Sequence, residues 1–558
     1  MPTLLCEAEG HTEGGAIGKP PEDPAQSETL SMRGNPSRGK REIPQVPVGD
    51  GTAGRPEKVT NRNPGRHARG KSDGRVIPGK PPNNDGDDPS AEAVEGRRPT
   101  EGNTLPEAAS RTQSRLDASI ALQRVREVAR RDRRARFTAL LHHVTVDLLR
   151  ESFYALRRHA APGIDGLTWD QYEVDLEDRL TDLHRRVHMG TYRAQPSRRT
   201  FIPKADGRMR PLGIATLEDK IVQQAAVTVL NQIYEVDFLG FSYGFRPGRG
   251  AHDALDALWV GLMGKKVNWV LDADIRGFFD AICHGWSGKF LEHRIADRRI
   301  LRLIRKWLRA GVSEDGQWSK TEVGTPQGAV ASPLLANVFL HYAFDLWVQQ
   351  WRTKFATGDM IVVRYADDFV VGFQHRRDAE RFHHELGERF QKFGLALHPE
   401  KTRLIEFGRF AAENRRKRGE GKPETFTFLG FTHICGRKHW SGGFIVKRRT
   451  AAKRLRAKLQ EVREALLRRR HEPIADLGKW LRSVMQGYFN YFAVPGNIVS
   501  LNMFRRETAR NWLHALRRRS QRHRLTWERF GPIVDSWFPR AQVLHEHPND
   551  RFYAKHPK

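Results

Sequence analysis

The sequence predicts an α+β fold that is followed by a helical C-terminal part and preceded by a disordered segment. Three observations lead to this prediction. The first 110 residues contain no Phe, Trp or Tyr. From about residue 112 to 432, apolar residues recur at spacings typical of helices in some segments and of strands in others. Residues 447–540 combine helical spacing with a large excess of positive charge.

The net charge favours a polyanionic partner. The chain has 558 residues, and 95 Lys and Arg against 66 Asp and Glu give a formal net charge of +29. This excess favours nucleic acid as the partner, the alternative being an ordinary solvated basic surface. The three cysteines, Cys6, Cys283 and Cys435, lie far apart. They exclude a disulfide scaffold and a thiolate zinc site and are typical of a reducing cytosol.

The sequence gives no indication of export or of a membrane partner. No apolar run approaches the ~18 residues that a membrane span needs. The opening residues lack the basic and apolar regions of a signal peptide. We therefore expect a cytoplasmic protein.

Residues 1–111 are expected to form a disordered extension. The first 110 residues hold 15 of the 30 prolines and 16 of the 49 glycines, with 15 basic and 17 acidic residues. A segment without large apolar side chains cannot offset the entropy lost on ordering. We assign this extension no function.

Ordered structure is expected to begin near residue 112. Helical spacing predicts helices over 112–156 and over roughly 168–187. Two short strands are expected within residues 198–214, around a turn at Asp206 and Gly207. Residues 447–540 hold 23 basic and 7 acidic residues, which predicts a small helical domain with a cationic face. Contact with RNA or DNA is favoured there over a plain solvated amphipathic surface.

The strongest chemical signal is a pair of adjacent acids between two apolar strands. Asp367 and Asp368 lie between the apolar residues 361–363 and 369–371. Adjacent carboxylates repel each other and lose hydration near a buried hairpin, and a divalent cation removes that cost. Oxygen ligands suit magnesium. The alternative for any single Asp-Asp pair is a surface turn.

A second acidic segment follows another apolar strand. Residues 269–271 lead into Asp272 and Asp274, and Asp280 follows. Acids from both segments would hold two magnesium ions about 3.5–4 Å apart, which activate a hydroxyl group and stabilise a leaving pyrophosphate. Two acidic segments at the ends of apolar strands weaken the surface-turn interpretation.

Eight motifs within residues 145–540 resemble, in order, those of group II intron reverse transcriptase/maturases. They are APGIDG, IPKADGRMRPLGI, SYGFRPGRGAHDAL, DADIRGFFDAI, TPQGAVASPLLANVFL, YADD, GLALHPEKT and FTFLGF. The resemblance implies a right-hand polymerase in which fingers and palm precede a helical thumb, called domain X. The implied boundaries are 112–265 for the fingers and N-terminal helices, 266–432 for the palm, 447–540 for the thumb, and 541–558 for a short tail.

The same resemblance selects the first catalytic acid. In polymerases of this kind that acid lies five residues before an aromatic residue. Asp274 is five before Phe279, whereas Asp272 is five before Gly277, so Asp274 is the expected residue. Phe279 would be a steric gate that selects dNTPs over rNTPs by overlap with a ribose 2′-hydroxyl group; the alternative is an ordinary core phenylalanine.

The remaining site residues are also implied by the resemblance. The catalytic acids, which are the expected ligands of two Mg²⁺ ions together with the backbone carbonyl of Ile275, are Asp274, Asp367 and Asp368. The residues expected around the dNTP substrate are Lys204, Arg210, Arg198, Phe279, Gln327 and Lys401. For the basic residues the alternative is exposed, solvated charge.

The implied function is the copying of intron RNA into DNA, combined with binding of the intron RNA to promote splicing and mobility. The implied partners are group II intron RNA, a DNA target or primer, and a second copy of the chain in a homodimer. No metal-like spacing of His or Cys follows Cys435, so we expect no endonuclease domain. The expected location is the cytoplasm, at the nucleoid when bound to DNA. The alternatives are an RNA-binding splicing factor with little polymerase activity and a domesticated or defence-associated reverse transcriptase.

Overall fold

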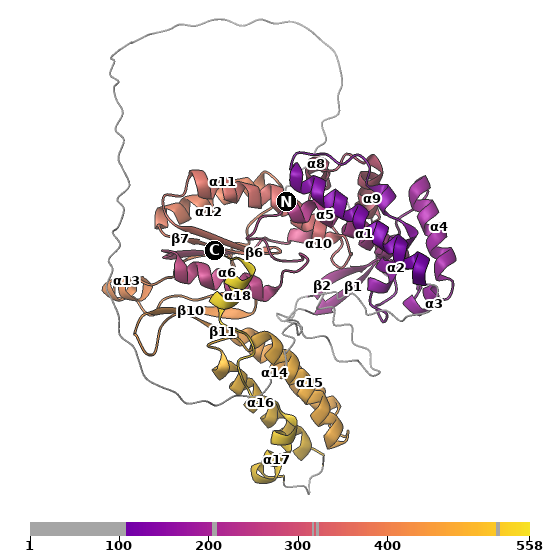
Figure 1. Ribbon diagram of the computed structural model, residues 1–558. Coiled ribbons are helices and arrows are strands. Elements are labelled where there is room, and N and C mark those ends of the chain that lie inside the picture. The colour runs from indigo at the N-terminus through magenta and orange to yellow at the C-terminus, as the bar shows by residue number, and fades with distance from the viewer. Residues whose placement is uncertain (1–107, 204–208, 315–316, 320–322, 520–524, 558) are drawn as a thin grey trace, which may run out of the picture. The chain divides into compact units, whose positions relative to one another are not determined.

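The described chain is an α+β protein with three β-sheets, and the predicted class is confirmed (Figure 1). The computed structural model describes residues 108–203, 209–314, 317–319, 323–519 and 525–557, with side chains from residue 119 onward. The predicted N-terminal extension lies outside this part except for its last four residues, which begin a helix. None of the described helices has the length and apolarity needed to cross a membrane.

Helices make up the first part of the described chain. The hydroxyl groups of Thr145 and Thr216 cap two of them by accepting backbone N–H groups. The helix expected over 168–187 is divided, because Asp175 leaves the helical backbone region at φ −115° and ψ 40°. These elements are α1 (Ala108–Arg131), η1 (Leu141–His143), α2 (Val146–Ala155), α3 (Trp169–Glu173), α4 (Leu176–Met189) and α5 (Leu217–Asp237).

The first sheet contains the two strands expected around Asp206 and Gly207, a turn that itself lies outside the described residues. Its strand order is β2-β1-β4-β5, with β1 and β2 antiparallel and β1 and β4 parallel. The strands are β1 (Ser197–Pro203), β2 (Met209–Ile214), β4 (Val312–Glu314) and β5 (Gln317–Ser319).

The central sheet is antiparallel and has the order β6-β7-β3-β8. Its strands are β3 (Trp269–Ala273), β6 (Met360–Tyr365), β7 (Asp368–Phe373) and β8 (Arg403–Glu406). The helices and turns described within residues 251–417 are α6 (Ala251–Gly264), α7 (Phe278–Ala281), α8 (His284–Glu292), α9 (Arg298–Arg309), α10 (Ser332–Leu340), the π-helical turn η2 (His341–Asp345), α11 (Leu346–Lys354), α12 (Arg376–Gln391) and α13 (Ala411–Lys417).

Alternate residues of the central strands enter two different hydrophobic cores, as the two-residue period of a strand requires. Leu271 and Val371 belong to the core that also contains residues of α12, whereas Val270 and Val370 belong to the core that contains residues of α6. The sheet is therefore covered on both faces, by α11 and α12 on one side and by α6 on the other (Figure 1). Burial on both faces explains why β3, β6 and β7 are apolar along most of their length.

The C-terminal part begins with a third sheet, in the order β11-β10-β9, and continues into helices with their own core. The helical spacing noted for residues 447–540 places apolar side chains on one face there, since Leu455, Val462 and Leu466 are buried. The last helix, α18, returns to α6, where Lys555 pairs with Asp253 at 2.8 Å. The elements are β9 (Phe426–Phe428), β10 (Phe431–Arg437), β11 (Phe444–Thr450), α14 (Ala452–Arg468), α15 (Ile474–Phe492), α16 (Ile498–Arg517), α17 (Trp527–Trp537) and α18 (Pro548–Lys555).

Truncating Phe382 should test the core beneath the central sheet. This fully buried ring of α12 lies about 5 Å from the rings of Trp347, Trp351 and Phe373. Phe382→Ala should lower the free energy of unfolding by about 3–5 kcal/mol, because it leaves a cavity. Phe410→Ala, at a ring that is 52% exposed, should change it by less than about 1 kcal/mol. Urea denaturation measures both, and equal losses would contradict the described packing.

Candidate active site

The adjacent acids lie in a tight turn between β6 and β7. Tyr365 and Asp368 are the last paired residues of this hairpin, so Ala366 and Asp367 form its two-residue loop. Ala366 has a positive φ of 55°, which costs a residue with a side chain about 1–2 kcal/mol. The turn is therefore strained at the position directly before the acids, and the surrounding structure must hold it in place.

Strand β3 brings the third acid to the same place. Ala273 pairs with Phe369 across the β3–β7 ladder, so the next residue, Asp274, lies beside Asp368. Besides desolvation, the charges of Asp367 and Asp274 both act to raise the pKa of Asp368, as expected for carboxylates that lie close together. The structure thus brings together Asp274, Asp367 and Asp368, which we call the acid corner.

Asp272 lies two residues earlier, on the same face of β3. Its carboxylate is 3.7 Å from Arg403 of β8. Desolvation raises its pKa to about 6, although Arg403 acts in the opposite direction. Asp272 therefore has a cationic partner on the neighbouring strand β8 and lies further along β3 from the turn that carries Asp367 and Asp368.

Burial and mutual repulsion shape the electrostatics of the acid corner. Burial, followed by the charge of Asp274, raises the pKa of Asp367, whereas Arg210 and Lys401 act to lower it. Desolvation, followed by the charges of Asp367, Asp274 and Asp272, raises the pKa of Asp368 to about 7. The Asp368 side chain is nevertheless exposed to solvent. The corner is thus a crowded group of carboxylates that a dissolved cation can reach.

The donor set fits a magnesium site. Hard carboxylate oxygens suit Mg²⁺, and a cation would relieve the repulsion that raises these pKa values. Among the described residues, no three His, Cys, Asp or Glu side chains already form a compact metal-binding group. Lys401 Nζ instead lies 2.5 Å from Asp274 Oδ2. Ile275, the expected carbonyl ligand, directly follows Asp274 and pairs with Leu397 in an isolated bridge.

The basic residues expected around the nucleotide fall in different places. Arg210 is exposed on β2 and acts electrostatically on Asp367. Arg198 donates a 2.8 Å hydrogen bond to the carbonyl of Pro162, in the APGIDG motif. Lys204 lies outside the described residues. Arg210 and Lys401 are therefore the two expected cations that the structure associates with the acid corner.

Phe279 and Gln327 lie on neighbouring segments. Phe279 is half-buried, while the adjacent Phe278 is buried in the core. The carbonyl of Phe279 accepts the N–H of Thr325 at 2.8 Å. Two residues along that loop, the carbonyl of Gln327 accepts the N–H of Gly213 at 2.7 Å. This loop, which contains the Pro-Gln-Gly motif, therefore connects the segment of Phe279 to β2.

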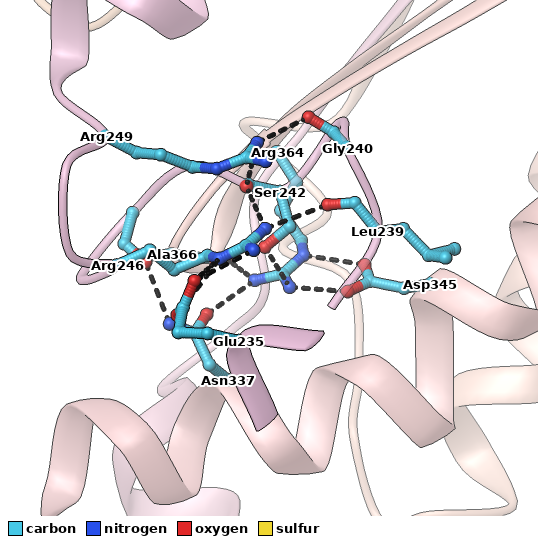
Figure 2. A network of polar contacts seen from close by, with 11 residues as sticks. Glu235, Leu239, Gly240, Ser242, Arg246, Arg249, Asn337, Asp345, Arg364 and Ala366 are labelled. Atoms are coloured by element: carbon cyan, nitrogen blue, oxygen red, sulfur yellow. Dashed lines mark hydrogen bonds and ion pairs between the residues drawn. The ribbon is translucent and has the colours of Figure 1, made fainter. Parts of the chain in front are cut away.

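A buried cation that the sequence analysis missed supports the strained turn (Figure 2). Arg364 of β6 is fully buried, and two of its nitrogens bind the carboxylate of Asp345 at 2.7 and 2.6 Å. It also donates to Ser242 Oγ at 2.7 Å, to Asn337 Oδ1 at 3.0 Å and to the carbonyl of Ala366 at 2.9 Å. The last bond fixes the peptide that leads into Asp367.

The segment before α6 holds the same turn from another side. Residues 241–243, at the start of the SYGFRPGRG motif, run beside β6, where Arg364 N donates to Phe241 O at 2.9 Å and Tyr243 N donates to Arg364 O at 2.9 Å. A Cβ atom at Gly244 would lie 2.3 Å from the Ala366 nitrogen, so only glycine allows this approach. Arg246, bonded to Glu235, donates to the carbonyl of Ser242 at 2.8 Å (Figure 2).

Comparison with known proteins agrees with this geometry. Residues 202–433 match the family described as reverse transcriptase (RNA-dependent DNA polymerase). Protein YkfC of Escherichia coli (strain K12) is 34% identical over 239 residues, which are 38% of this chain and 62% of that protein. Group II intron-encoded protein LtrA of Lactococcus lactis subsp. cremoris is 37% identical over 221 residues, which are 39% of this chain and 36% of LtrA.

The fold, the acid corner and these matches define a protein with a reverse transcriptase domain. The chain is also similar to a group II intron-encoded protein, in agreement with the resemblance of its motifs. A further relative is nuclear intron maturase 2, mitochondrial, of Arabidopsis thaliana, which is 31% identical over 109 residues, or 19% of this chain and 15% of that protein. The matched regions span less than two thirds of the length of each of these relatives.

Replacing Arg364 should show how strongly its ion pair with Asp345 affects the free energy of unfolding. Arg364→Met leaves Asp345 buried without its partner and should lower the free energy of unfolding by about 3–5 kcal/mol. The double variant Arg364→Met/Asp345→Leu removes both charges and should recover at least about half of that loss. Urea denaturation of both single variants and of the double variant measures the coupling. Additive losses would contradict a paired role for these two side chains.

Proposed function

We propose that the chain is an RNA-directed DNA polymerase that also binds group II intron RNA as a maturase. The observation that carries this proposal is the meeting of Asp274 with Asp367 and Asp368, which are 93 and 94 positions further along the sequence. Their shared corner belongs to the segment that matches the reverse transcriptase family. The proposed substrates are dNTPs, an RNA template and a DNA primer.

The acid corner would hold two Mg²⁺ ions through the side chains of Asp274, Asp367 and Asp368, with the carbonyl of Ile275 as a further ligand. When bound, such ions lower the pKa of the primer hydroxyl group and offset the negative charge of the leaving pyrophosphate. Binding of a cation is favourable here because it offsets the repulsion between neighbouring carboxylates and the loss of their hydration. The exposure of Asp368 gives the ions and the nucleotide a route to the corner.

The neighbouring side chains would bind and select the nucleotide. Arg210 and Lys204 would supply positive charge for the triphosphate. Lys401 contacts Asp274, and a bound cation would compete with it for that carboxylate. The half-buried ring of Phe279 offers a surface against the sugar, and Gln327 lies in the loop bonded to the Phe279 backbone.

The maturase part of the proposal rests on charge. Residues 447–540 hold 23 basic and 7 acidic residues, and α14 exposes Lys453, Arg454 and Arg456. Such a surface binds phosphate groups without reading sequence. The intron RNA would supply the splicing chemistry and the recognition of the DNA target, while the protein stabilises the folded RNA and makes the cDNA needed for mobility. Homodimer formation and association with the nucleoid stay predictions.

Replacing Asp367 should test the polymerase. Asp367→Asn should lower the rate of primer extension on an RNA template with dNTPs and Mg²⁺ by at least about 100-fold, because the corner loses a preorganised charge. Glu400→Gln, at an exposed carboxylate, should leave the rate unchanged. A wild-type chain that binds intron RNA and promotes splicing but does not extend primers would favour the splicing-factor alternative.

Splicing measured with the same variant separates the two activities. Asp367→Asn should still promote splicing of the intron, since its basic surface is unchanged. Parallel loss of splicing and extension in a folded Asp367→Asn protein would contradict the separation. The DNA around the coding sequence adds an independent criterion, because a domesticated or defence-associated enzyme would lack flanking intron RNA structure.

Truncating Phe279 should relax sugar selection. Phe279→Ala removes the ring proposed to overlap a 2′-hydroxyl group and should lower the preference for dNTP over rNTP by about 10- to 200-fold, the range for steric discrimination in a pocket. Phe279→Tyr keeps the ring and should keep the preference. Single-nucleotide insertion kinetics with matched dNTP and rNTP measure both. An unchanged ratio in Phe279→Ala would show that Phe279 is a packing residue only.

A further inference from the structure

The hairpin of β10 and β11 has a well-formed tip. The strands pair from Phe431 with Thr450 to Arg437 with Phe444, whereas the third strand, β9, pairs only with residues 431–433 of β10. At the tip, Lys438 N donates to Gly443 O at 2.7 Å and Gly442 N donates to Lys438 O at 3.1 Å. Gly442 takes the left-handed conformation, with φ 64°. These bonds give residues 438–443, the hairpin tip, a defined backbone.

The hairpin tip carries the most exposed large apolar side chain of the described residues. Trp440 is 95% exposed, compared with 80% for Val174, the next in this group. Its one described ring neighbour is His439, the preceding residue, at 5.1 Å between ring centroids. A tryptophan held in water on an ordered turn adds little to the folded core. Its large flat surface is available to a partner.

The charge around Trp440 indicates the chemistry of that partner. Residues 425–460 contain nine Lys and Arg and no Asp or Glu. Arg437, Lys438 and Lys447 are exposed, and no carboxylate of the described chain lies within ion-pair distance of them. The stem of Lys447 lies across Gly436, where an added Cβ would be 2.8 Å from Lys447 Cε. A polyanion is therefore the partner that complements this hairpin.

We propose that the hairpin tip binds an unpaired nucleotide of RNA, with Trp440 stacked on the base and Arg437, Lys438 and Lys447 near the adjacent phosphates. The proposal extends the RNA binding that is part of the proposed function to a surface other than the acid corner. A base within a duplex is already stacked on both faces, whereas loops and bulges present free faces to aromatic side chains. One ring is enough for such a contact. An anionic membrane would favour several inserted apolar groups, and the neighbouring Phe444 and Ile445 are half-buried.

Binding of two model RNAs by the full chain tests the stacking. The first is a fluorescently labelled RNA hairpin with a long unpaired loop, and the second is a fully paired duplex of matched length. Trp440→Ala should weaken binding of the looped RNA by at least about fivefold and leave duplex binding unchanged, because a base–aromatic stack is lost. Trp440→Phe should restore most of the affinity. Since the side chain is exposed, the thermal unfolding midpoint of both variants should match that of the wild type.

The salt dependence distinguishes stacking from charge. Each phosphate contact on a single strand contributes about 0.7 to the slope of log affinity against log salt concentration. Lys438→Gln should therefore reduce the slope by about that amount, whereas Trp440→Ala should leave the slope unchanged. Phe410→Ala serves as a control at another exposed aromatic side chain, 52% exposed and outside residues 447–540, and should keep wild-type affinity.

Several outcomes would overturn the proposal. They are unchanged binding of the looped RNA by Trp440→Ala, equal losses in Trp440→Ala and Phe410→Ala, equal losses on the duplex, and a loss confined to anionic phosphatidylserine vesicles. Primer extension with saturating pre-annealed template and primer separates this proposal from the proposed function. If the wild-type protein does not extend the primer, the proposed polymerase activity is contradicted, but the RNA-binding test of Trp440 still applies. Wild-type protein that extends while Trp440→Ala binds looped RNA normally contradicts only the hairpin proposal.

Discussion

The buried guanidinium of Arg364 is the interaction on which the candidate site depends. Three carboxylates that repel one another must be held together before any cation arrives, and the turn that carries two of them is strained at Ala366. Arg364 holds the carbonyl of that strained residue, and Asp345 neutralises Arg364 within the core. The buried pair of Arg364 and Asp345 thus stabilises a strained turn and a group of repelling carboxylates that would be unfavourable without it.

The sequence predicted the central strands well, because the pattern that marks a strand is local. The apolar residues on either side of Asp367 and Asp368 indicated a buried hairpin, and the two-residue period placed successive side chains in two cores. The choice of Asp274 over Asp272 came from the resemblance to known polymerases. In the structure Asp274 lies beside Asp368, while Asp272 is paired with Arg403. Their catalytic roles stay predictions.

The parts that could not be predicted depend on contacts between distant segments. Arg364 was visible as a charged residue inside an apolar strand, but nothing local identified Asp345, Asn337 and Ser242 as its partners. Arg198 has the residue type expected for a triphosphate contact, yet it hydrogen-bonds the backbone of Pro162. The tail expected over 541–558 contains α18, whose ion pairs to α6 link residues about 300 positions apart. Local patterns carry no signal for such pairings.

The two cores on either face of the central sheet constrain how proteins with this sheet can diverge. Because strand side chains alternate with a period of two, inserting or deleting one residue within β3 would exchange its two faces and move Asp274 away from β7. The loops in the long segment between β3 and β6 have no such restriction on parity, although the helical part of that segment carries Asn337 and Asp345, which bind Arg364. Loops can therefore gain or lose residues during evolution, whereas a single-residue insertion or deletion within β3 is not tolerated because it would exchange the two faces of the strand.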